Sequence, residues 1–257
     1  MKEKEPILIG IPTGDGRITA ALGKMLFDAA ALSDDPDHPF RYGLYMPRGY
    51  RPVDKARNLI VQEALKLRAR RVMMVDSDMN PPWNWWVLLC HDEPAVSGVM
   101  YGWGKPLGQE GSEILLNVAY DLAEDGSFYS VEVNRKAPFH VDAVGSANLV
   151  LRTELFEQLS PPWFKTKWSE IDGGVDEGED MAFFRRAHDQ LGIRALVDPR
   201  IRFGHEKAVD LMDVAHLTQF CRRLGYEEGA RAGFAAGQEG AVIVDEENQM
   251  AGRQAGA

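Results

Sequence analysis

The sequence lacks the features that define several common classes of protein. It has only two cysteines, Cys90 and Cys221, in 257 residues, so neither a disulfide framework nor a thiolate metal site is indicated. No apolar segment is long enough for a signal peptide or a membrane span, and the charged residues 1–6 lead directly into an apolar run. These absences predict a cytoplasmic protein in a reducing compartment, without a membrane span.

Positive charge is also scarce. The chain has 29 Lys and Arg residues against 39 Asp and Glu residues, a formal net charge of −10. A surface with this balance is poorly suited to neutralise nucleic-acid phosphates, so we do not expect duplex DNA as a partner. The glycine-rich stretch at residues 12–16 has neither the G-x-G-x-x-G nor the G-x-x-x-x-G-K-[ST] spacing, and therefore supports neither a dinucleotide fold nor a P-loop.

The apolar patterns that are present indicate an α/β protein. With 45% hydrophobic and 26% charged residues, the composition is typical of a globular chain. Apolar runs at residues 7–12, 40–46 and 72–75 predict strands, and helical spacing at residues 18–32 and from Arg51 onward predicts helices between them. Right-handed crossovers in this β-α-β-α-β series predict a Rossmann-like, mixed but mostly parallel sheet flanked by helices.

The middle of the chain predicts a small antiparallel insertion. A helix with an aromatic side is expected at residues 83–89 and a fourth buried strand at residues 94–104. Residues 114–122 and 128–133, joined by an Asp-Gly turn, predict a hairpin, with more strand material from 139 to 151. The polar, glycine-containing residues 165–178 resemble a mobile loop.

We expect one domain at residues 1–225, closed by a helix from Val209 to about Gly225. Residues 226–257 are rich in Ala, Gly, Gln and Glu. They predict either a weakly ordered tail or a segment that packs on a partner subunit, as in a homo-oligomer.

The apolar run at 72–75 ends in two carboxylates, Asp76 and Asp78, followed by a double proline. In an open α/β sheet, ligands collect outside the carboxyl ends of the strands, and carboxylate oxygens are suitable ligands for a divalent cation. The alternative is a solvated aspartate pair at an ordinary strand exit, because Asp-x-Asp is a common sequence.

Three other groups are candidate site residues, each with a simpler alternative. Arg57 and Asn58 are either exposed helix polars or, at the sheet edge, groups that meet a pyrophosphate. Glu179 and Asp180 either complement a helix dipole or include a carboxylate that accepts a proton from a hydroxyl. His205 is either a loop residue or the imidazole that completes a coordination shell begun by the two aspartates.

The order of these elements resembles the GT-A glycosyltransferases, especially the bacterial and phage branch near the family of cellulose- and chitin-synthase-like enzymes. The likeness covers residues 7–207. It rests on motifs in this order: Pro12-Thr13-Gly14, Ala56-Arg57-Asn58, Asp76-Ser77-Asp78-Met79, Val96-Ser97-Gly98, Val141-Asp142-Ala143-Val144-Gly145, Pro162-Trp163-Phe164, Glu179-Asp180 and Gly204-His205.

The resemblance implies a metal site. Asp78 would bind a divalent cation directly, Asp76 would hold the ribose or bind the metal through water, and His205 would be the third protein ligand. A nitrogen ligand favours Mn²⁺ over Mg²⁺. The cation would stabilise the diphosphate that leaves from a sugar nucleotide.

The resemblance also implies a donor pocket and a base. Pro12, Thr13 and Gly14 would line the nucleobase pocket, with Arg57 and Asn58 near the nucleotide. Asp180 would be the base on the acceptor side, with Glu179 as its neighbour or substitute. These two acids would be the catalytic residues.

The predicted function is therefore metal-dependent transfer of a sugar from a UDP- or GDP-sugar to an acceptor hydroxyl. The acceptor can be a glycan, a protein or a small molecule, and both inverting and retaining chemistry stay open. The absence of membrane helices and of a processive-synthase acceptor signature indicates a non-processive enzyme. A nucleotidyltransferase, a metal phosphohydrolase and a non-catalytic nucleotide-sugar-binding protein are the alternatives.

Overall fold

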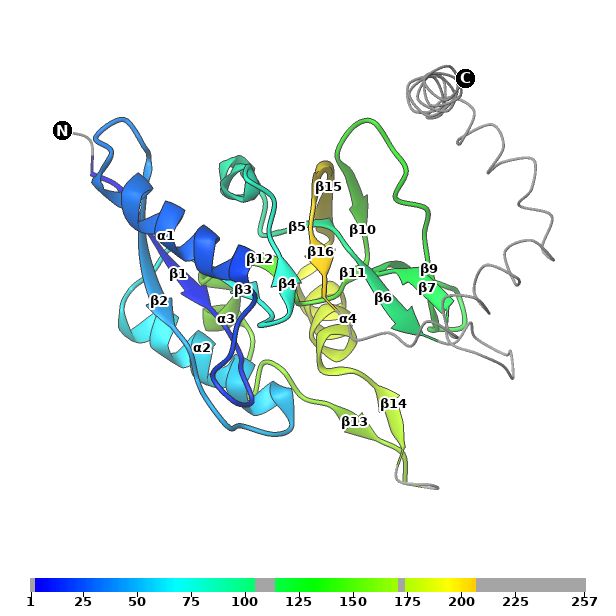
Figure 1. The fold of residues 1–257 in the computed structure, drawn as a ribbon. Helices are drawn as coiled ribbons and strands as arrows, with labels where there is room; N and C mark the ends of the chain where they lie inside the picture. Colours follow the sequence, from blue (N-terminus) through cyan, green and yellow to red (C-terminus); the bar gives the residue numbers. More distant parts are fainter. Residues whose placement is uncertain (1–2, 105–113, 171–173, 207–257) are drawn as a thin grey trace, which may run out of the picture. The chain divides into compact units, whose positions relative to one another are not determined.

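The chain from its N-terminus to His205 alternates strands and helices much as the apolar patterns predict. A computed structural model describes residues 3–104, 114–170 and 174–206, which belong to one compact unit, Met1–Lys207 (Figure 1). The helix predicted at 209–225 and the tail at 226–257 lie outside the described residues, so the predicted domain boundary between them stays a prediction.

A seven-stranded mixed sheet forms the centre of the fold, with the order β10-β15-β5-β12-β3-β1-β2. In chain order its strands are β1 (Glu5–Gly10), β2 (Phe40–Tyr45), β3 (Arg71–Val75), β5 (Ala95–Val99), β10 (Phe139–Val141), β12 (Asn148–Arg152) and β15 (Ala195–Arg202). Parallel pairs join β1 to β2 and β3, and β5 to β15, whereas β12 and β10 run against their neighbours. The other five strands share one direction, which confirms the predicted mixed, mostly parallel sheet.

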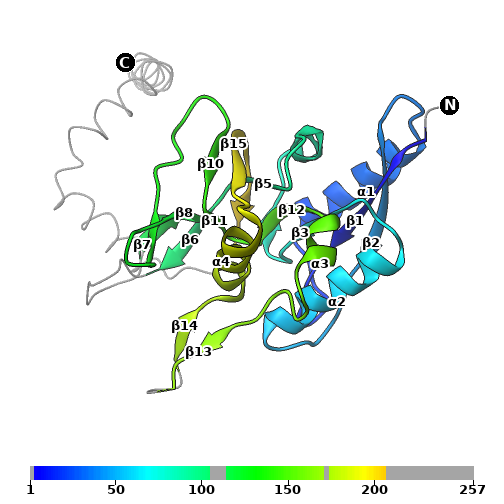
Figure 2. The ribbon, with the colours of Figure 1, turned by 180° about the vertical axis from the view of Figure 1, so that it is seen from behind.

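Helices cover both faces of this sheet, as Figures 1 and 2 show from opposite sides. The helices are α1 (Ala20–Asp34), α2 (Val53–Lys66), the 3₁₀ helix η1 (Trp85–Cys90), α3 (Glu154–Gln158) and α4 (Glu179–Leu191). Successive strand residues point to opposite faces, so Ile9 and Val75 pack in the layer of α1, whereas Leu8 and Met74 pack in the layer of α2. None of the helices in the described ranges is long and apolar enough to cross a membrane.

Strand β12 is inserted antiparallel between β3 and β5, at the centre of the sheet. Its apolar residues serve both layers, with Leu149 and Leu151 on the side of α2 and Val150 on the side of α1. The buried Asn148 at its start is satisfied, because its amide donates to the Gly98 carbonyl (3.3 Å) and its carbonyl oxygen accepts from Ser97. The sequence predicts this strand but not its place.

Four small antiparallel sheets accompany the large one. They pair β11 (Ala143–Val144) with β8 (Ala119–Leu122) and β8 with β9 (Phe128–Ser130), β6 (Tyr101–Gly104) with β7 (Ile114–Asn117), β16 (Gly204–His205) with β4 (Met79–Asn80), and β13 (Lys167–Trp168) with β14 (Val175–Glu177). The predicted hairpin is thus confirmed for β8 and β9. The β7 part of the predicted 114–122 strand pairs with β6 instead.

Two local predictions are corrected. In place of the helix predicted at residues 83–89, Trp85–Cys90 form a short 3₁₀ helix, in which the burial of Trp85 and Leu88 at i and i+3 matches three residues per turn. Residues 165–178, predicted as a mobile loop, include the hairpin β13–β14, because Lys167 pairs with Glu177 across it and Ser169 N donates to Gly174 O (2.8 Å). Polar composition did not reveal this cross-strand pairing.

Candidate functional site

The turn after β3 is fastened to the start of α1 at the carboxyl edge of the sheet. Thr19 N donates to Ser77 O at 3.1 Å, and Thr19 Oγ1 donates to Met79 O at 2.6 Å. The same hydroxyl caps α1, and Met79 N donates to Asp76 O (3.1 Å) to close the turn. These hydrogen bonds hold Asp76, Ser77 and Asp78 at the carboxyl edge of the sheet, where the sequence predicts them.

The two aspartates of this turn point to different partners. Asp76 forms an ion pair with Arg57 Nη2 at 3.0 Å, whereas Asp78 Oδ2 lies 3.1 Å from His205 Nε2. The structure thus brings Asp78 and His205 together, as expected for a shared site. Asp76 instead points toward the guanidinium of Arg57. Asp76 stays only a prediction as a metal ligand.

His205 reaches Asp78 because β16 pairs with β4, the strand that follows the turn. Glu206 N donates to Asp78 O (2.8 Å), and His205 pairs with Met79 in register. The other ring nitrogen, Nδ1, lies 3.1 Å from the Tyr101 carbonyl oxygen, which can only accept a hydrogen bond. Nδ1 therefore donates to this oxygen, and Nε2 is the donor in the contact with Asp78, because a carboxylate also only accepts. A histidine that binds a metal through Nε2 usually donates its Nδ1 hydrogen in the same way, and a cation between Nε2 and Oδ2 would replace the Nε2 hydrogen.

The Asp78–His205 pair, which is hydrogen-bonded in this structure, would supply two ligands of a larger metal shell. Two ligands about 2.1 Å from one ion and at right angles lie about 3 Å apart. The separation of Nε2 and Oδ2, 3.1 Å, matches that spacing. In the described part of the chain, no group of three or more His, Cys, Asp or Glu side chains could hold a metal. Water and substrate phosphates are ligands that Mg²⁺ usually keeps in addition to one or two protein groups.

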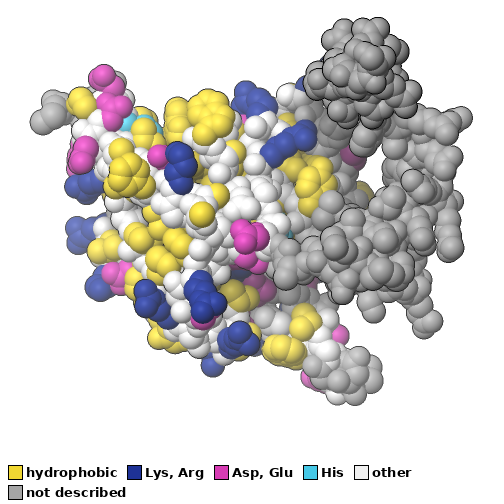
Figure 3. All heavy atoms as spheres, in the orientation of Figure 1, with side chains coloured by type: hydrophobic (Ala, Val, Ile, Leu, Met, Phe, Trp, Pro, Cys, Tyr) yellow, Lys and Arg dark blue, Asp and Glu magenta, His cyan; other side chains and the backbone are white. Residues whose placement is uncertain are grey.

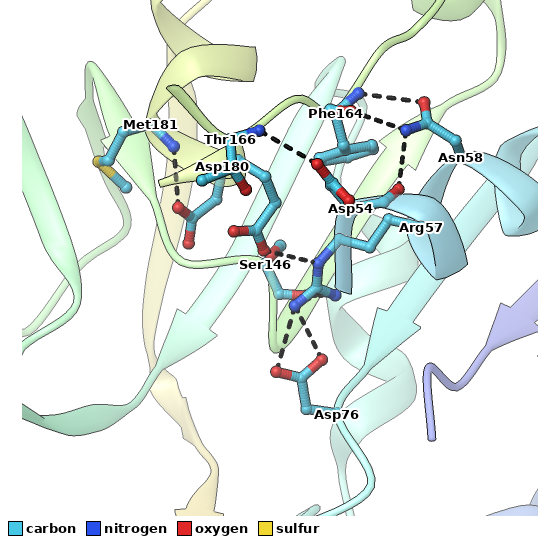
Figure 4. A network of polar contacts seen from close by, with 10 residues as sticks. Asp54, Arg57, Asn58, Asp76, Ser146, Phe164, Thr166, Asp180 and Met181 are labelled. Carbon is cyan, nitrogen blue, oxygen red and sulfur yellow. Dashed lines mark hydrogen bonds and ion pairs between the residues drawn. The ribbon is translucent and has the colours of Figure 1, made fainter. Parts of the chain in front are cut away.

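Arg57 joins three elements in a second polar cluster (Figure 4). From the first turn of α2, Nε donates to Glu179 Oε1 (3.0 Å), Nη2 binds Asp76, and Nη1 donates to Ser146 O (3.5 Å). Its side chain is only 4% exposed. Burial by itself lowers the pKa of Arg57, but Asp76, Glu179 and Asp180 outweigh it and raise the pKa. The guanidinium therefore stays charged and is shared among carboxylates.

Asp180 is the second residue of α4, directly after Glu179, and is partly buried. Burial and repulsion by Glu179 raise the pKa of Asp180 to about 6, although Arg57 opposes them. Its Oδ1 accepts from Met181 N at 2.9 Å. The phenol of Tyr120, on β8, has its pKa raised by burial and by Asp180. A carboxylate with this pKa, at the sheet edge, is suited to accept a proton near neutral pH.

The predicted nucleobase loop lies at the same edge. Pro12 and Thr13 are buried, and Thr13 bonds Pro47 O (3.2 Å) and Gly49 N (3.0 Å) in the loop after β2. Gly14 is exposed, and a Cβ there would lie 3.6 Å from the Arg51 guanidinium. Pro12 and Thr13 thus set the shape of the loop, while Gly14 is its accessible part.

Asn58 has a clear structural role. Its amide donates to Phe164 O (2.7 Å), and its carbonyl oxygen accepts from Trp163 N (2.8 Å). It also borders a groove of about 500 Å³ beside α2, together with Lys55. Both ends of its amide fix the 163–164 backbone, so its predicted contact with a nucleotide stays a prediction.

Sequence reasoning missed Ser146 and Tyr120. Ser146 is 1% exposed, its carbonyl accepts from Arg57, and its Oγ has no hydrogen-bond partner among the described residues. The one available signal was the small-residue turn at Gly145, where a Cβ would lie 2.5 Å from Met100 Cε. No local pattern indicated that Tyr120 lies near Asp180.

Fold and site together define a mixed α/β protein with carboxylates, an imidazole and a buried guanidinium at the carboxyl edge of its sheet. No protein-family model matches the chain, and no curated protein matches it.

Solved structures with some likeness include that of A197 from STIV, at 17% identity and a TM-score of 0.49, over 79% of this chain and 86% of that chain. S. aureus TarS 1-349 is 13% identical with a TM-score of 0.40, over 78% of this chain and 60% of that one. HddC from Yersinia pseudotuberculosis is 10% identical with a TM-score of 0.34, over 77% and 92%. Such values give no ground for transferring a function.

Proposed function

We propose that this chain is a GT-A glycosyltransferase that transfers a sugar from a nucleoside diphosphate sugar to an acceptor hydroxyl. The observation that carries the proposal is the contact between Asp78 and His205, which are 127 positions apart in sequence. This contact is made at the sheet edge, and the Tyr101 carbonyl orients the imidazole. Such a pair supports a site for a metal-bound diphosphate.

Asp78 and His205 would hold Mn²⁺ or Mg²⁺, with Mn²⁺ favoured by the nitrogen ligand. When bound there, the cation supplies the positive charge that stabilises the leaving diphosphate. Asp76 is held by Arg57 at 3.0 Å and is 27% exposed, so it is placed to accept a hydrogen bond from a ribose hydroxyl. The exposed Gly14 lets the backbone approach the nucleotide closely.

Asp180 would accept the proton of the acceptor hydroxyl as its oxygen attacks the sugar. Its raised pKa, about 6, leaves it mostly ionised but basic at pH 7. Glu179 is committed to Arg57 at 3.0 Å, which supports Asp180 rather than Glu179 as the base. The main role of Arg57 would then be to position Asp76 and Glu179, and a contact with the nucleotide would be a second role.

The first test is a thermal-shift panel of UDP, GDP, CDP and dTDP, each with and without Mn²⁺. A ligand that binds the native state raises its apparent stability. We expect one nucleoside diphosphate to raise the Tm of the parent protein only in the presence of Mn²⁺. The Asp78→Ala variant should lose this shift, whereas Asp37→Ala, at an exposed loop aspartate, should keep it.

Absence of any metal-dependent shift in Tm, or an unchanged shift in Asp78→Ala, would overturn the proposal.

The reaction products distinguish sugar transfer from the alternative functions. Release of nucleoside diphosphate from a sugar nucleotide, increased by an acceptor, supports sugar transfer. Consumption of a nucleoside triphosphate with a sugar phosphate would indicate a nucleotidyltransferase, and release of inorganic phosphate a phosphohydrolase. Metal-dependent binding without turnover would indicate a binding protein.

A further inference from the structure

The hairpin β13–β14 carries two apolar side chains that the fold leaves exposed. Trp168 is 55% exposed and Val175 is 56% exposed, and the two are cross-strand partners. Single exposed apolar residues are normal on protein surfaces. An exposed indole beside an exposed valine on a two-stranded sheet is less usual, because such a sheet is only marginally stable and gains no burial from these side chains.

Both ends of this hairpin start at the candidate site. Before β13, Thr166 N donates to Asp54 Oδ2 (3.3 Å) in the first turn of α2, three residues before Arg57 (Figure 4). After β14, the chain passes through Gly178 directly into Glu179 and Asp180. At about 3.3 Å per residue, the backbone from Val175 to Asp180 spans no more than about 17 Å. The hairpin therefore extends from the rim of the site.

Ion pairs hold the hairpin in place without using Trp168. Glu177 binds Lys167 across the strands and Arg185 Nε on α4 at 2.7 Å. The register shifts between Lys167 and Trp168, which leaves Asp176 on β14 outside the strand pairing. The exposed indole is thus supported by contacts that do not cover it.

The chemistry around the indole favours a sugar over a protein. Exposed carboxylates of Glu170, two residues after Trp168, and of Asp176, directly after Val175, belong to the same hairpin segment and can accept hydrogen bonds from hydroxyl groups. A stable protein interface covers about 800 Å² on each partner, far more than two side chains provide. On the face drawn in Figure 3, apolar side chains of the described residues occur in small groups among charged ones.

We propose that Trp168 is a carbohydrate-binding platform, on which a sugar ring of a glycan acceptor stacks while a hydroxyl of the same glycan reaches Asp180. This inference rests on the proposed function and specifies its acceptor as a glycan. The hairpin segment carries the acidic residues Glu170, Asp176 and Glu177 and the basic residues Lys165 and Lys167, of which Lys167 is paired with Glu177. This balance does not favour glycans that carry carboxylates or sulfates, so we expect the platform to accept neutral or amino sugars.

The test is retention of the full-length protein on an array of immobilised oligosaccharides, both neutral and acidic, in the absence of donor. We expect retention on neutral glycans. Trp168→Ala should weaken it by about tenfold, the contribution of one aromatic contact, and Trp168→Phe should retain most of it. Trp83→Ala, at an indole that is 81% exposed on another loop, is the matched control and should bind like the parent.

Asp78→Ala should also bind the array like the parent, because it affects only the donor. If the protein binds neutral glycans but no nucleoside diphosphate, the proposed function is contradicted, whereas the glycan-binding role of Trp168 is supported. Three results would overturn the platform: no retention of the parent, equal retention by Trp168→Ala, or an equal loss in Trp83→Ala. A change of oligomeric state in Trp168→Ala would assign the indole to contact with a second copy and would also overturn it.

Discussion

Two carboxylates in this protein, Asp180 at the start of α4 and Asp198 on β15, have pKa values shifted in opposite directions. Burial and the repulsion of Glu179 raise the pKa of Asp180 to about 6. Burial also acts to raise the pKa of Asp198, but hydrogen bonds from Arg200 and His91 outweigh it and lower the pKa to about 2. The same side chain is thus disfavoured as an anion in one place and strongly favoured in the other.

The two carboxylates differ in the number of hydrogen-bond donors that they do not share with another carboxylate. Asp198 accepts from Arg200 Nη2 (2.7 Å), from Arg200 N (3.0 Å) and from His91 Nε2 (2.9 Å). Near Asp180, the buried cation Arg57 is shared by Asp76 and Glu179. Fully satisfied carboxylates stabilise a fold, whereas an under-neutralised carboxylate can accept a proton. This contrast supports a structural role for Asp198 and the role of base that we propose for Asp180.

The largest effect is expected from removing the shared cation. Arg57→Met should lower the free energy of unfolding by about 3 kcal/mol, because Asp76 and Glu179 lose their buried partner. Chemical denaturation measures this change. Lys24→Met, which removes a surface pair with Asp28, should change stability by less than about 0.5 kcal/mol. Equal effects of the two substitutions would show that the Arg57 cluster is no more buried than a surface pair.

Asp180→Asn should reduce the rate of sugar transfer by about 100-fold or more, the usual loss when a general base is removed. Glu179→Gln should have a smaller effect, because its role is to position. The asparagine variant should also be at least as stable as the parent at pH 7. A raised folded pKa means that ionised Asp180 opposes folding, and this cost grows as the pH rises through about 6. Unchanged transfer by Asp180→Asn would remove this residue from the role of base.

Asp198→Asn should lower the free energy of unfolding by about 1–2 kcal/mol at pH 7 and leave transfer unaffected. The pKa of Asp198 is lowered on folding, so its stabilisation is present above about pH 4 and is lost as the pH falls through about 2. The difference between variant and parent should shrink over that range in thermal unfolding. A constant difference would mean that shape, rather than charge, makes Asp198 important.

The smallest predicted effect concerns the pH profile of the parent protein. Transfer should fall by about tenfold per pH unit below about 6, as Asp180 takes up its proton. The Arg57→Lys variant keeps the positive charge but loses the several N–H donors of the guanidinium. It should therefore stabilise the Asp180 carboxylate less, and the fall of the transfer rate at acid pH should begin at a higher pH. A profile that is flat between pH 5 and 7 would contradict the assignment of Asp180.

Much of the fold could be predicted because its signals are local. The buried run at residues 72–75, the helical spacing in α1 and α2, and the Asp-Gly turn between β8 and β9 each reflect burial or turn geometry within a few residues. The place of β12 between β3 and β5 could not be predicted, because strand pairing depends on segments some 75 and 50 residues away.

Several residues of the candidate site were named from the sequence, but their pairing could not be predicted. The residues Asp76, Asp78, Glu179, Asp180 and His205 were named because strand ends and helix starts present side chains at a sheet edge. That Asp78 meets His205 while Asp76 turns to Arg57 depends on the pairing of β16 with β4 and on the position of α2.

The sequence by itself determined most strands of the large sheet, the helices α1 and α2, and a set of charged residues near the ends of these elements. Those features follow from side-chain periodicity and backbone preference, which act over a few residues. Only the tertiary structure decided which carboxylate has a guanidinium to itself, which carboxylates share one, and that the indole of Trp168 stays exposed. Desolvation and Coulomb interactions depend on burial and on distances between atoms that lie far apart in the chain, and no local spacing encodes them.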